Sequence, residues 1–338
     1  MRRRLLSAFV AALVLAPTAA AKQASWALPQ IKVVVGAGIM GTDVASFHPD
    51  DALTKVALEQ LVAGLTHTTP AVVTSPTAPV TMSTLDARLV NALGLSETAK
   101  LFQQSAKTAG LAPPSRFGAE ATARLLGLRL NHPASQDSLE LSPNETATRA
   151  EAAYSGAQAL KLGQWELPAL QEAAATFTLP ALTPWQQKIL KTAVRFIGYP
   201  YIWGGEYETP VSPYGAQVHG GFDCSGFVWR VYKIQQYPGA TTLSSTLQGR
   251  TTYVMSGEVP RSKRISFAKL QPADVIFFGA RGPASKPAQV DHMGIYLGNG
   301  WFIHSSGYGV AIAQLDGWYK QRFAWGRRPL AEAGLSPS

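Results

Sequence analysis

One segment of this 338-residue chain joins a glycine turn to its only cysteine: Gly220-Gly221-Phe222-Asp223-Cys224-Ser225-Gly226-Phe227-Val228-Trp229-Arg230-Val231-Tyr232. Glycines, an Asp and then a periodic apolar run predict a loop that enters a helix, with Asp223 near the N-cap and Cys224 in the first turn. The helix macrodipole and the free backbone N–H groups there favour a thiolate, so we expect a lowered pKa and a nucleophilic Cys224. The alternative is that this lone Cys is only a small buried hydrophobe.

A thiol nucleophile requires a base, and two of the six histidines lie in one strand-turn-strand pattern, Asp291 to Ser306. A two-residue loop would put His292 and His304 on opposite faces of this hairpin, whereas a three-residue loop Gly298–Gly300 or a β-bulge puts them on the same face. On one face, His292 can take the thiol proton and return it to the leaving amine, while His304 orients the imidazole. A metal site built on the two histidines is the rival interpretation, but no third ligand is evident.

The start of the chain has the pattern of a secretory signal peptide over residues 1–21. Arg2, Arg3 and Arg4 precede the apolar run Leu5–Leu15, and small residues follow at positions 19 to 21. The run is too short to span a bilayer, and no later segment is long enough, so we expect no transmembrane anchor in the mature chain. The single cysteine excludes an intramolecular disulfide, and the sequence predicts neither a metal nor a cofactor.

The net charge of +9 is unevenly distributed along the chain. Residues 22–180 hold 11 basic and 13 acidic side chains, whereas residues 181–338 hold 16 basic and 8 acidic ones. The basic C-terminal half points to an anionic partner, but no base-stacking motif or cluster of Lys and Arg supports nucleic acid. An acidic cell-surface polymer fits an exported protein better.

The N-terminal half contains an internal repeat, because Pro49 and Thr54 recur as Pro143 and Thr148 at the same offset of 94 residues. Each unit has a Gly-hydrophobic turn, a loop containing Pro, and a Thr that can cap the next helix. Residues 79–93 resemble the helical part of a further copy, with Thr84 and Asp86 near its start and without the loop.

This pattern resembles the S-layer homology repeat, most closely at Thr148-Arg149-Ala150-Glu151. In that family, three repeats form a small helical pseudo-trimer that holds a protein to an anionic secondary cell-wall polymer. The resemblance therefore implies wall docking by the N-terminal half. The alternative is that these Thr, Arg and Glu residues only cap and solvate helices.

The segment from about Thr183 to Leu330 resembles the NlpC-type cell-wall cysteine peptidases, which are papain-like enzymes that cut peptidoglycan stem peptides. Five pieces carry the match: Gly198–Gly205, Phe222–Gly226, Leu270–Phe278, His292–Gly298 and Phe302–Ser305. The resemblance implies a nucleophile at Cys224, a base at His292 and an orienting residue at His304. It also implies substrate contacts by Tyr201, Trp203, Asp223 and Ser225, with the Tyr201 hydroxyl near the oxyanion. As a departure, Ser244 stands where the family often has Arg.

These observations predict an α+β protein. After the signal peptide (1–21) we expect S-layer-homology-like helical repeats (22–178), a linker (179–183), a papain-like peptidase domain (184–331) and a tail (332–338). In the peptidase domain, the helix carrying the Cys is expected to pack on an antiparallel sheet that carries both His residues.

The expected function is that of a secreted, cell-wall-associated peptidoglycan hydrolase, a cysteine endopeptidase acting on stem peptides. The bond expected to be cut links γ-D-glutamate to the diamino acid. An amidase or acyltransferase on the same scaffold is one alternative. A wall-binding protein with an inactive peptidase domain is another.

Overall fold

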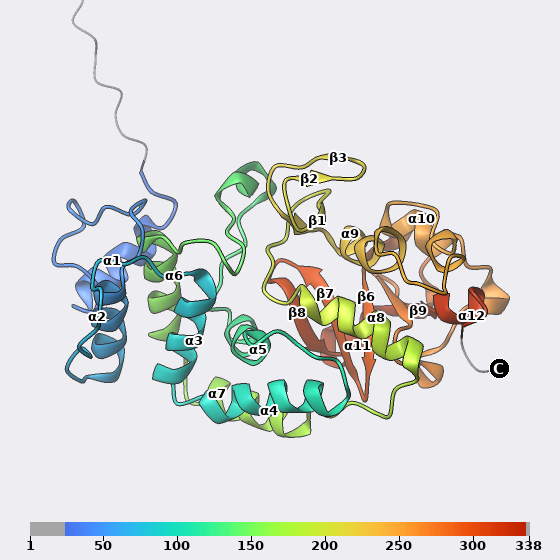
Figure 1. Ribbon diagram of the computed structural model, residues 1–338, viewed down its shortest axis with the longest axis horizontal. Helices are drawn as coiled ribbons and strands as arrows, with labels where there is room; N and C mark the ends of the chain where they lie inside the picture. Colours follow the sequence, from blue (N-terminus) through green and yellow to red (C-terminus); the bar gives the residue numbers. More distant parts are fainter. Residues whose placement is uncertain (1–23, 336–338) are drawn as a thin grey trace, which may run out of the picture.

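The computed structural model describes residues 24–335, so the predicted signal peptide lies outside the described residues. Figure 1 shows the N-terminal helices at one end of the molecule and a mixed helix and sheet region at the other, with α5 (Phe117–Leu125) between them. The predicted α+β class is confirmed. No helix within residues 24–335 is long and apolar enough to cross a membrane.

The N-terminal half is mainly helical, as predicted. Besides α5, its helices are α1 (Leu28–Gly36), α2 (Lys55–Thr66), α3 (Met82–Ala92), α4 (Ser96–Thr108), α6 (Arg149–Ala159) and α7 (Glu166–Thr176), with a 3-10 segment at Ala134–Leu139. Their apolar faces are fully or almost fully buried, for example at Ile31, Leu61, Leu89 and Phe102. Burial of these faces stabilises helices that are too short to be stable alone.

Three helices of this half are arranged around a ring of backbone hydrogen bonds. Thr54, Thr81 and Thr148 cap α2, α3 and α6, and each threonine side chain accepts a hydrogen bond from the third residue of its helix. Just before these caps, Leu53 N–H donates to Ala147 O at 2.8 Å, Ala147 N–H to Val80 O at 2.9 Å, and Val80 N–H to Leu53 O at 3.0 Å. The closed ring relates three copies of one loop and helix.

The middle copy therefore differs from the one expected. Its helix begins at Met82 with Thr81 as the cap, so Thr84 lies in the first turn, as expected, and Asp86 is buried in the next turn. Its loop is present as well, because Val56 N–H donates to Pro76 O as Ala150 N–H does to Pro49 O. The expectation that this loop is missing was wrong because backbone pairing defines the loop, and its side chains do not follow the pattern of the other copies.

The C-terminal half begins with α8 (Pro184–Arg195) and two short antiparallel strand pairs, β1 (Glu206–Tyr207) with β4 (Gly221–Phe222) and β2 (Val211–Ser212) with β3 (Gly215–Ala216). Next come α9 (Cys224–Trp229), which continues as a π-helical turn over Arg230–Ile234, and α10 (Thr252–Gly257). An antiparallel sheet of order β8-β7-β6-β5-β9 follows. Along the chain, α11 lies between β8 and β9, and α12 follows β9. The bounds are β5 (Val275–Gly279), β6 (Val290–Gly298), β7 (Trp301–Ser306), β8 (Gly309–Gln314), α11 (Gly317–Arg322), β9 (Phe323–Arg327) and α12 (Pro329–Glu332).

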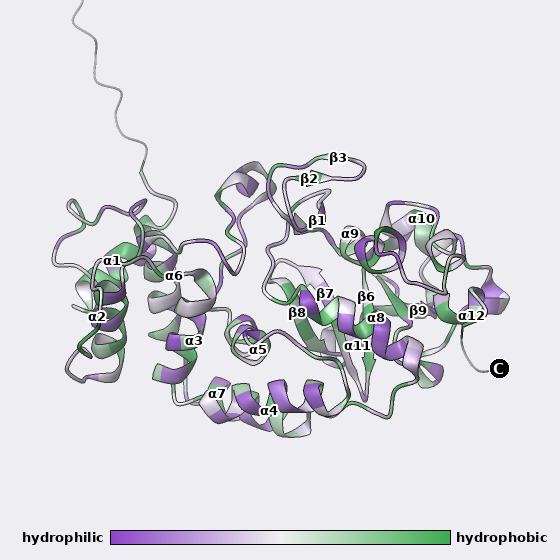
Figure 2. Cartoon of the chain, viewed as in Figure 1, coloured by the Kyte–Doolittle hydropathy of each residue, from purple (hydrophilic) through white to green (hydrophobic). Residues whose placement is uncertain are grey.

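The two halves share one continuous hydrophobic core. Phe102 of α4, Phe177 after α7 and Trp301 of β7 contact one another in tilted and edge-to-face arrangements, with ring centroids 5.0 to 5.9 Å apart. Figure 2 shows hydrophobic and hydrophilic residues alternating along α8, whose apolar side is buried at Ile189 and Leu190. The N-terminal helices are thus packed directly against the sheet.

The ends of the C-terminal half are also defined by specific contacts. Thr183 caps α8 in a reciprocal capping box with Gln186, at the expected end of the linker. At the other end, α12 extends to Glu332, one residue beyond the expected boundary at 331, and Glu332 pairs with Arg327 at 2.8 Å.

Candidate active site

Cys224 is the first residue of α9, and Asp223 is its N-cap, accepting a hydrogen bond from Gly226 N–H at 2.5 Å. The helix packs against β6 and β7. A Cβ atom on Gly226 would lie 1.9 Å from Gly205 O, so only glycine allows the segment before β1 to approach this closely. The thiol therefore lies where α9 meets both the β6–β7 hairpin and the segment that ends at Gly205.

His292 of β6 and His304 of β7 lie on one face of their hairpin. Ile295 pairs with Ile303, and a bulge near Gly298 precedes the tight turn at Asn299 and Gly300. This is the bulge alternative considered above, and it brings His292 Nε2 to 2.7 Å from His304 Nδ1. Because the two ring nitrogens are within hydrogen-bond distance, His304 can orient the His292 imidazole.

The environment of Cys224 changes the acid–base behaviour expected from its helix position. Burial and the neighbouring carboxylate of Asp223 raise the pKa of the Cys224 thiol to about 11. Hydrogen bonds from Thr252 Oγ1, at 3.3 Å, and from Met293 N–H only partly offset this rise. The expectation of a lowered pKa was therefore wrong, because desolvation of the buried sulfur outweighs the helix terminus.

Burial acts in the opposite direction on the two histidines, because it disfavours the charged imidazolium. It lowers the pKa of His292 to about 4 and that of His304 well below its ordinary value. At neutral pH the resting site therefore holds a neutral thiol and neutral imidazoles instead of an ion pair. His292 is then a base that is ready to accept a proton. When its Nε2 carries the hydrogen donated to His304, its Nδ1 is left to receive that proton.

Aromatic side chains enclose the two histidines on the side of α11. Tyr319 lies edge-on to the His304 ring, with centroids 5.4 Å apart, and Phe278 stacks on His292 at 5.6 Å. A cavity of about 320 Å³ adjoins His304 where α5 meets β8, lined in part by Leu125, Ala311 and Tyr308. Both halves of the chain therefore line the space next to the orienting histidine.

Tyr201 and Trp203 lie in the loop Gly198–Gly205 that leads to β1, which we call the strap. Burial and the nearby Cys224 and Asp223 raise the pKa of the Tyr201 hydroxyl, so this group is neutral and can donate a hydrogen bond. The Trp203 side chain is 73% exposed. The Tyr201 hydroxyl thus lies near Cys224 and Asp223, whereas Trp203 is exposed to solvent.

Asp223 and Ser225 flank the thiol and belong to one polar network. Ser225 Oγ donates to Asp223 Oδ1 at 2.8 Å, and Arg250 Nη1 donates to Ser225 Oγ at 2.8 Å and to Asp223 Oδ1 at 3.2 Å. Arg250 also pairs with Glu206 at 2.8 Å. Arg250 holds these groups together. The site therefore contains an arginine, although Ser244 stands where the family often has one. The sequence reasoning missed Arg250 because nothing local links it to Cys224.

Within the part of the chain that the structure describes, no group of three or more His, Cys, Asp or Glu side chains is placed to hold a metal ion. The two histidines instead pair with each other. The arrangement suits nucleophilic catalysis, with a thiol, a neutral base, an orienting imidazole and a hydroxyl donor drawn from distant parts of the chain.

Similarity to known proteins is found for part of the chain. Residues 198–328 match the NlpC/P60 family. The chain is 33% identical over 144 residues to the probable peptidoglycan endopeptidase LytE of Bacillus subtilis, covering 42% of this chain and 34% of that protein. It is 32% identical over 148 residues to the murein DD-endopeptidase MepH of Escherichia coli, covering 42% and 46%. It is 25% identical over 126 residues to the γ-D-glutamyl-L-lysine dipeptidyl-peptidase of B. subtilis, covering 37% and 34%.

The chain spans less than half the length of each of these curated relatives. All three are named as peptidases, and two of the names specify peptidoglycan or murein. The expected similarity of the C-terminal half to NlpC-type enzymes is thereby confirmed. Residues 198–328 of this chain form an NlpC/P60 domain.

Proposed function

We propose that this protein is a peptidoglycan hydrolase, a cysteine endopeptidase in which Cys224 is the nucleophile, His292 the base and His304 the orienting residue. One observation carries the proposal: Cys224 begins the helix α9, which packs on β6 and β7, and on these two strands His292 Nε2 lies 2.7 Å from His304 Nδ1. The neutral protonation states suit a base-catalysed attack.

In the proposed reaction, His292 removes the thiol proton as the Cys224 sulfur attacks the carbonyl carbon of the scissile amide. The carbonyl oxygen becomes an oxyanion, which the neutral Tyr201 hydroxyl stabilises by donating a hydrogen bond. His292 then gives its proton to the departing amine, leaving a thioester on Cys224. Water, deprotonated by the same imidazole, hydrolyses the thioester and restores the thiol.

The groups around the thiol support recognition of a peptide that approaches from the strap side. Asp223 and Ser225, held by Arg250, offer polar groups beside the nucleophile, and the exposed Trp203 ring can pack on the bound chain. On this basis we assign substrate binding to Trp203, Asp223 and Ser225, and to Tyr201 through the oxyanion that forms as the sulfur attacks. Arg250 organises two of them.

We propose that the scissile bond links γ-D-glutamate to the diamino acid. The name of the B. subtilis dipeptidyl-peptidase specifies a γ-D-glutamyl bond, which supports this choice, whereas that of MepH specifies a DD-endopeptidase. Purified muropeptides digested with the full chain and analysed by mass spectrometry are expected to yield fragments that end in D-glutamate and fragments that begin with the diamino acid. Release of intact stem peptides from the glycan would instead show an amidase. Products in which the cleaved peptide is joined to a second amine would show an acyltransferase.

We also propose that the protein is exported and that its N-terminal half docks on an anionic wall polymer. The three capped helices around one backbone ring support this proposal, because they form the threefold arrangement that the repeat pattern implies. Arg149, after the third cap, holds the first loop by donating to Phe47 O at 2.8 Å. The alternative is that these residues only cap and solvate helices. Sedimentation with cell walls, described below, distinguishes this alternative from docking.

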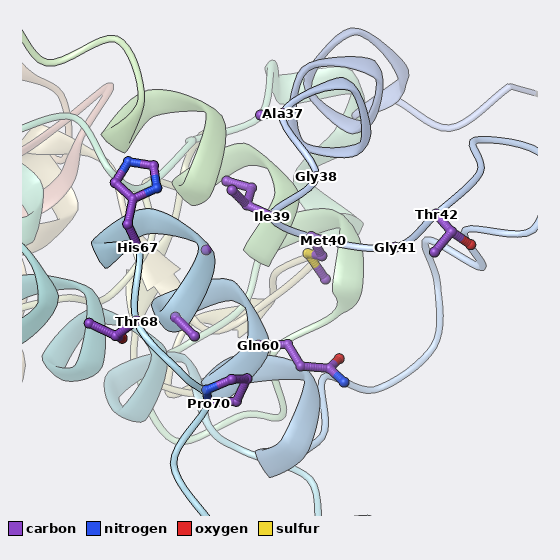
Figure 3. A pocket seen from close by; sticks show the side chains of 12 residues that line it. Ala37, Gly38, Ile39, Met40, Gly41, Thr42, Gln60, His67, Thr68 and Pro70 are labelled. Atoms are coloured by element: carbon purple, nitrogen blue, oxygen red, sulfur yellow. The ribbon is translucent and has the colours of Figure 1, made fainter.

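An open hollow of about 550 Å³ in the first unit is a candidate contact region. Figure 3 shows Gln60, His67 and Thr68 on one side of it and the Gly38–Thr42 segment on the other. The hollow is lined by side-chain amide, imidazole and hydroxyl groups, and by backbone of a glycine-containing turn. Such groups can hydrogen-bond a sugar polymer, and a carboxylate added here should repel an anionic one.

We expect the full-length Cys224→Ala protein to sediment with intact cell walls but much less with walls stripped of anionic polymers by hydrofluoric acid. Adding His67→Asp should reduce the pelleted fraction about threefold at low salt, because a carboxylate repels the polymer. Asp tolerates the left-handed backbone of His67, whose φ is 54°. Gln104→Glu adds the same charge on the exposed side of α4 and serves as the control. Equal pelleting on both wall preparations would refute docking on an anionic polymer.

A further inference from the structure

The N-terminal half reaches into the active site through side chains that hold the strap. The strap, Gly198–Gly205, carries Tyr201 and runs alongside α9. We propose that Asn131 is a positioning residue for Tyr201, so that the N-terminal half completes the catalytic site in addition to any role in docking. This inference rests on the proposed peptidase function.

Asn131 binds both backbone polar groups of Tyr201. Its Nδ2 donates to Tyr201 O at 2.9 Å, and its Oδ1 accepts from Tyr201 N–H at 2.6 Å. A side-chain amide that pairs with both groups of one residue imitates a neighbouring β-strand and fixes that residue's backbone. Because the Tyr201 ring projects from this backbone, Asn131 sets where the hydroxyl lies relative to Cys224.

Other contacts fix the strap on either side of Tyr201. Asp137, also from the N-terminal half, accepts a hydrogen bond from Trp203 N–H at 3.0 Å, and Arg124 donates to Gly198 O. On the catalytic side, Gly204 N–H donates to Asp223 Oδ2 at 3.1 Å. The strap is therefore held between N-terminal side chains and the residue that precedes the nucleophile, which couples the two halves at the reacting centre.

The competing explanation is that these hydrogen bonds only attach one half of the protein to the other. Arg116 supplies a matched control for that role, because it also makes two hydrogen bonds across the junction. Its guanidinium donates to Arg195 O at 2.8 Å and to Ile197 O at 3.2 Å, just before the strap begins. Arg116→Ala removes this attachment and a cation–π contact with Tyr199 of the strap, but it leaves both Asn131 hydrogen bonds to Tyr201 in place.

The test compares Asn131→Ala, Asn131→Asp and Arg116→Ala in the full chain, each alone and combined with Tyr201→Phe, using purified muropeptides as substrate. Asn131→Ala is expected to lower kcat about tenfold or more with little change in KM, because transition-state stabilisation is lost and binding is not. Asn131→Asp keeps the acceptor for Tyr201 N–H and should lose less. Arg116→Ala should change kcat by less than about twofold.

The double variants show whether Asn131 acts through Tyr201. In the Tyr201→Phe background, Asn131→Ala should cause little additional loss, because the hydroxyl that it positions is already absent. Iodoacetamide should alkylate Cys224, the only cysteine, at the same rate in wild type and Asn131→Ala, since the thiol itself is unchanged. Melting temperatures identify any loss of folding, and Asn131→Asp keeps the test valid if Asn131→Ala unfolds.

The outcomes distinguish this inference from the function on which it rests. If wild type releases fragments but Asn131→Ala loses no more activity than Arg116→Ala, or loses it equally with and without the Tyr201 hydroxyl, the positioning role is wrong and the peptidase proposal stands. If wild type releases no fragments from any muropeptide, both proposals are overturned.

Discussion

Cys224→Ala is expected to abolish release of soluble fragments from peptidoglycan, with a fall in rate of at least ~10³-fold. No other side chain in the sequence supplies a thiol, so covalent catalysis of the proposed kind cannot continue without it. The measurement is the rate of new amine appearance from purified muropeptides, followed by mass spectrometry of the products.

The fold of Cys224→Ala should remain intact, because the change removes one buried sulfur and introduces no larger group. The melting temperature and circular dichroism spectrum are expected to match those of wild type closely. A folded Cys224→Ala protein that still releases fragments would contradict the peptidase mechanism. A wild-type protein that binds walls without cleaving them would instead favour the wall-binding alternative.

His292→Ala and His304→Gln are expected to differ in the size of their effects. His292→Ala should reduce turnover by about 10³-fold or more, because proton removal from the thiol and proton delivery to the amine both fail. His304→Gln should lose about 10- to 100-fold, since its side-chain carbonyl can still accept the hydrogen bond from His292. Equal and complete loss in both variants, or full activity in His292→Ala, would show that these roles are assigned wrongly.

The same pair determines the pH dependence. Because burial lowers the pKa of His292 to about 4, the base is neutral throughout the mildly acidic range, and the acidic limb of the activity profile should lie below the usual histidine value of 6.5. Folding stability should also fall as the pH drops from 6.5 towards 4, because the unfolded chain takes up a proton that the folded site refuses. His292→Gln, which cannot titrate, should lose this part of the stability change.

Several features were predictable because short-range chemistry determines them. An Asp before an apolar run caps a helix, and Asp223 does cap α9. Because side chains alternate along strands, His292 and His304 can share one face of the hairpin only if it contains a bulge or a three-residue loop. The choice between those two was open, because both preserve the face on which each residue lies. The bulge was decided by the whole sheet, in which each strand has to pair with its neighbours.

The middle copy of the loop and cap was harder to find in the sequence. Pro76 and Thr81 occupy the positions of Pro49 and Thr54, but the residues between them share little with the other copies. Backbone hydrogen bonds close the ring, and they place few demands on side-chain identity. A repeat that is preserved in backbone pairing therefore leaves only a weak pattern in the sequence.

By itself, the sequence determined which residues can do the chemistry: one thiol, two histidines in a hairpin, and an aromatic and glycine-rich segment ahead of them. The tertiary structure decided their protonation states and their partners. Burial, which depends on every packed element, raises the pKa of Cys224 against the local effect of the helix terminus. Asn131 meets Tyr201 across 70 positions of the chain, and such a contact leaves no local signal because it exists only once the two halves pack around a common core.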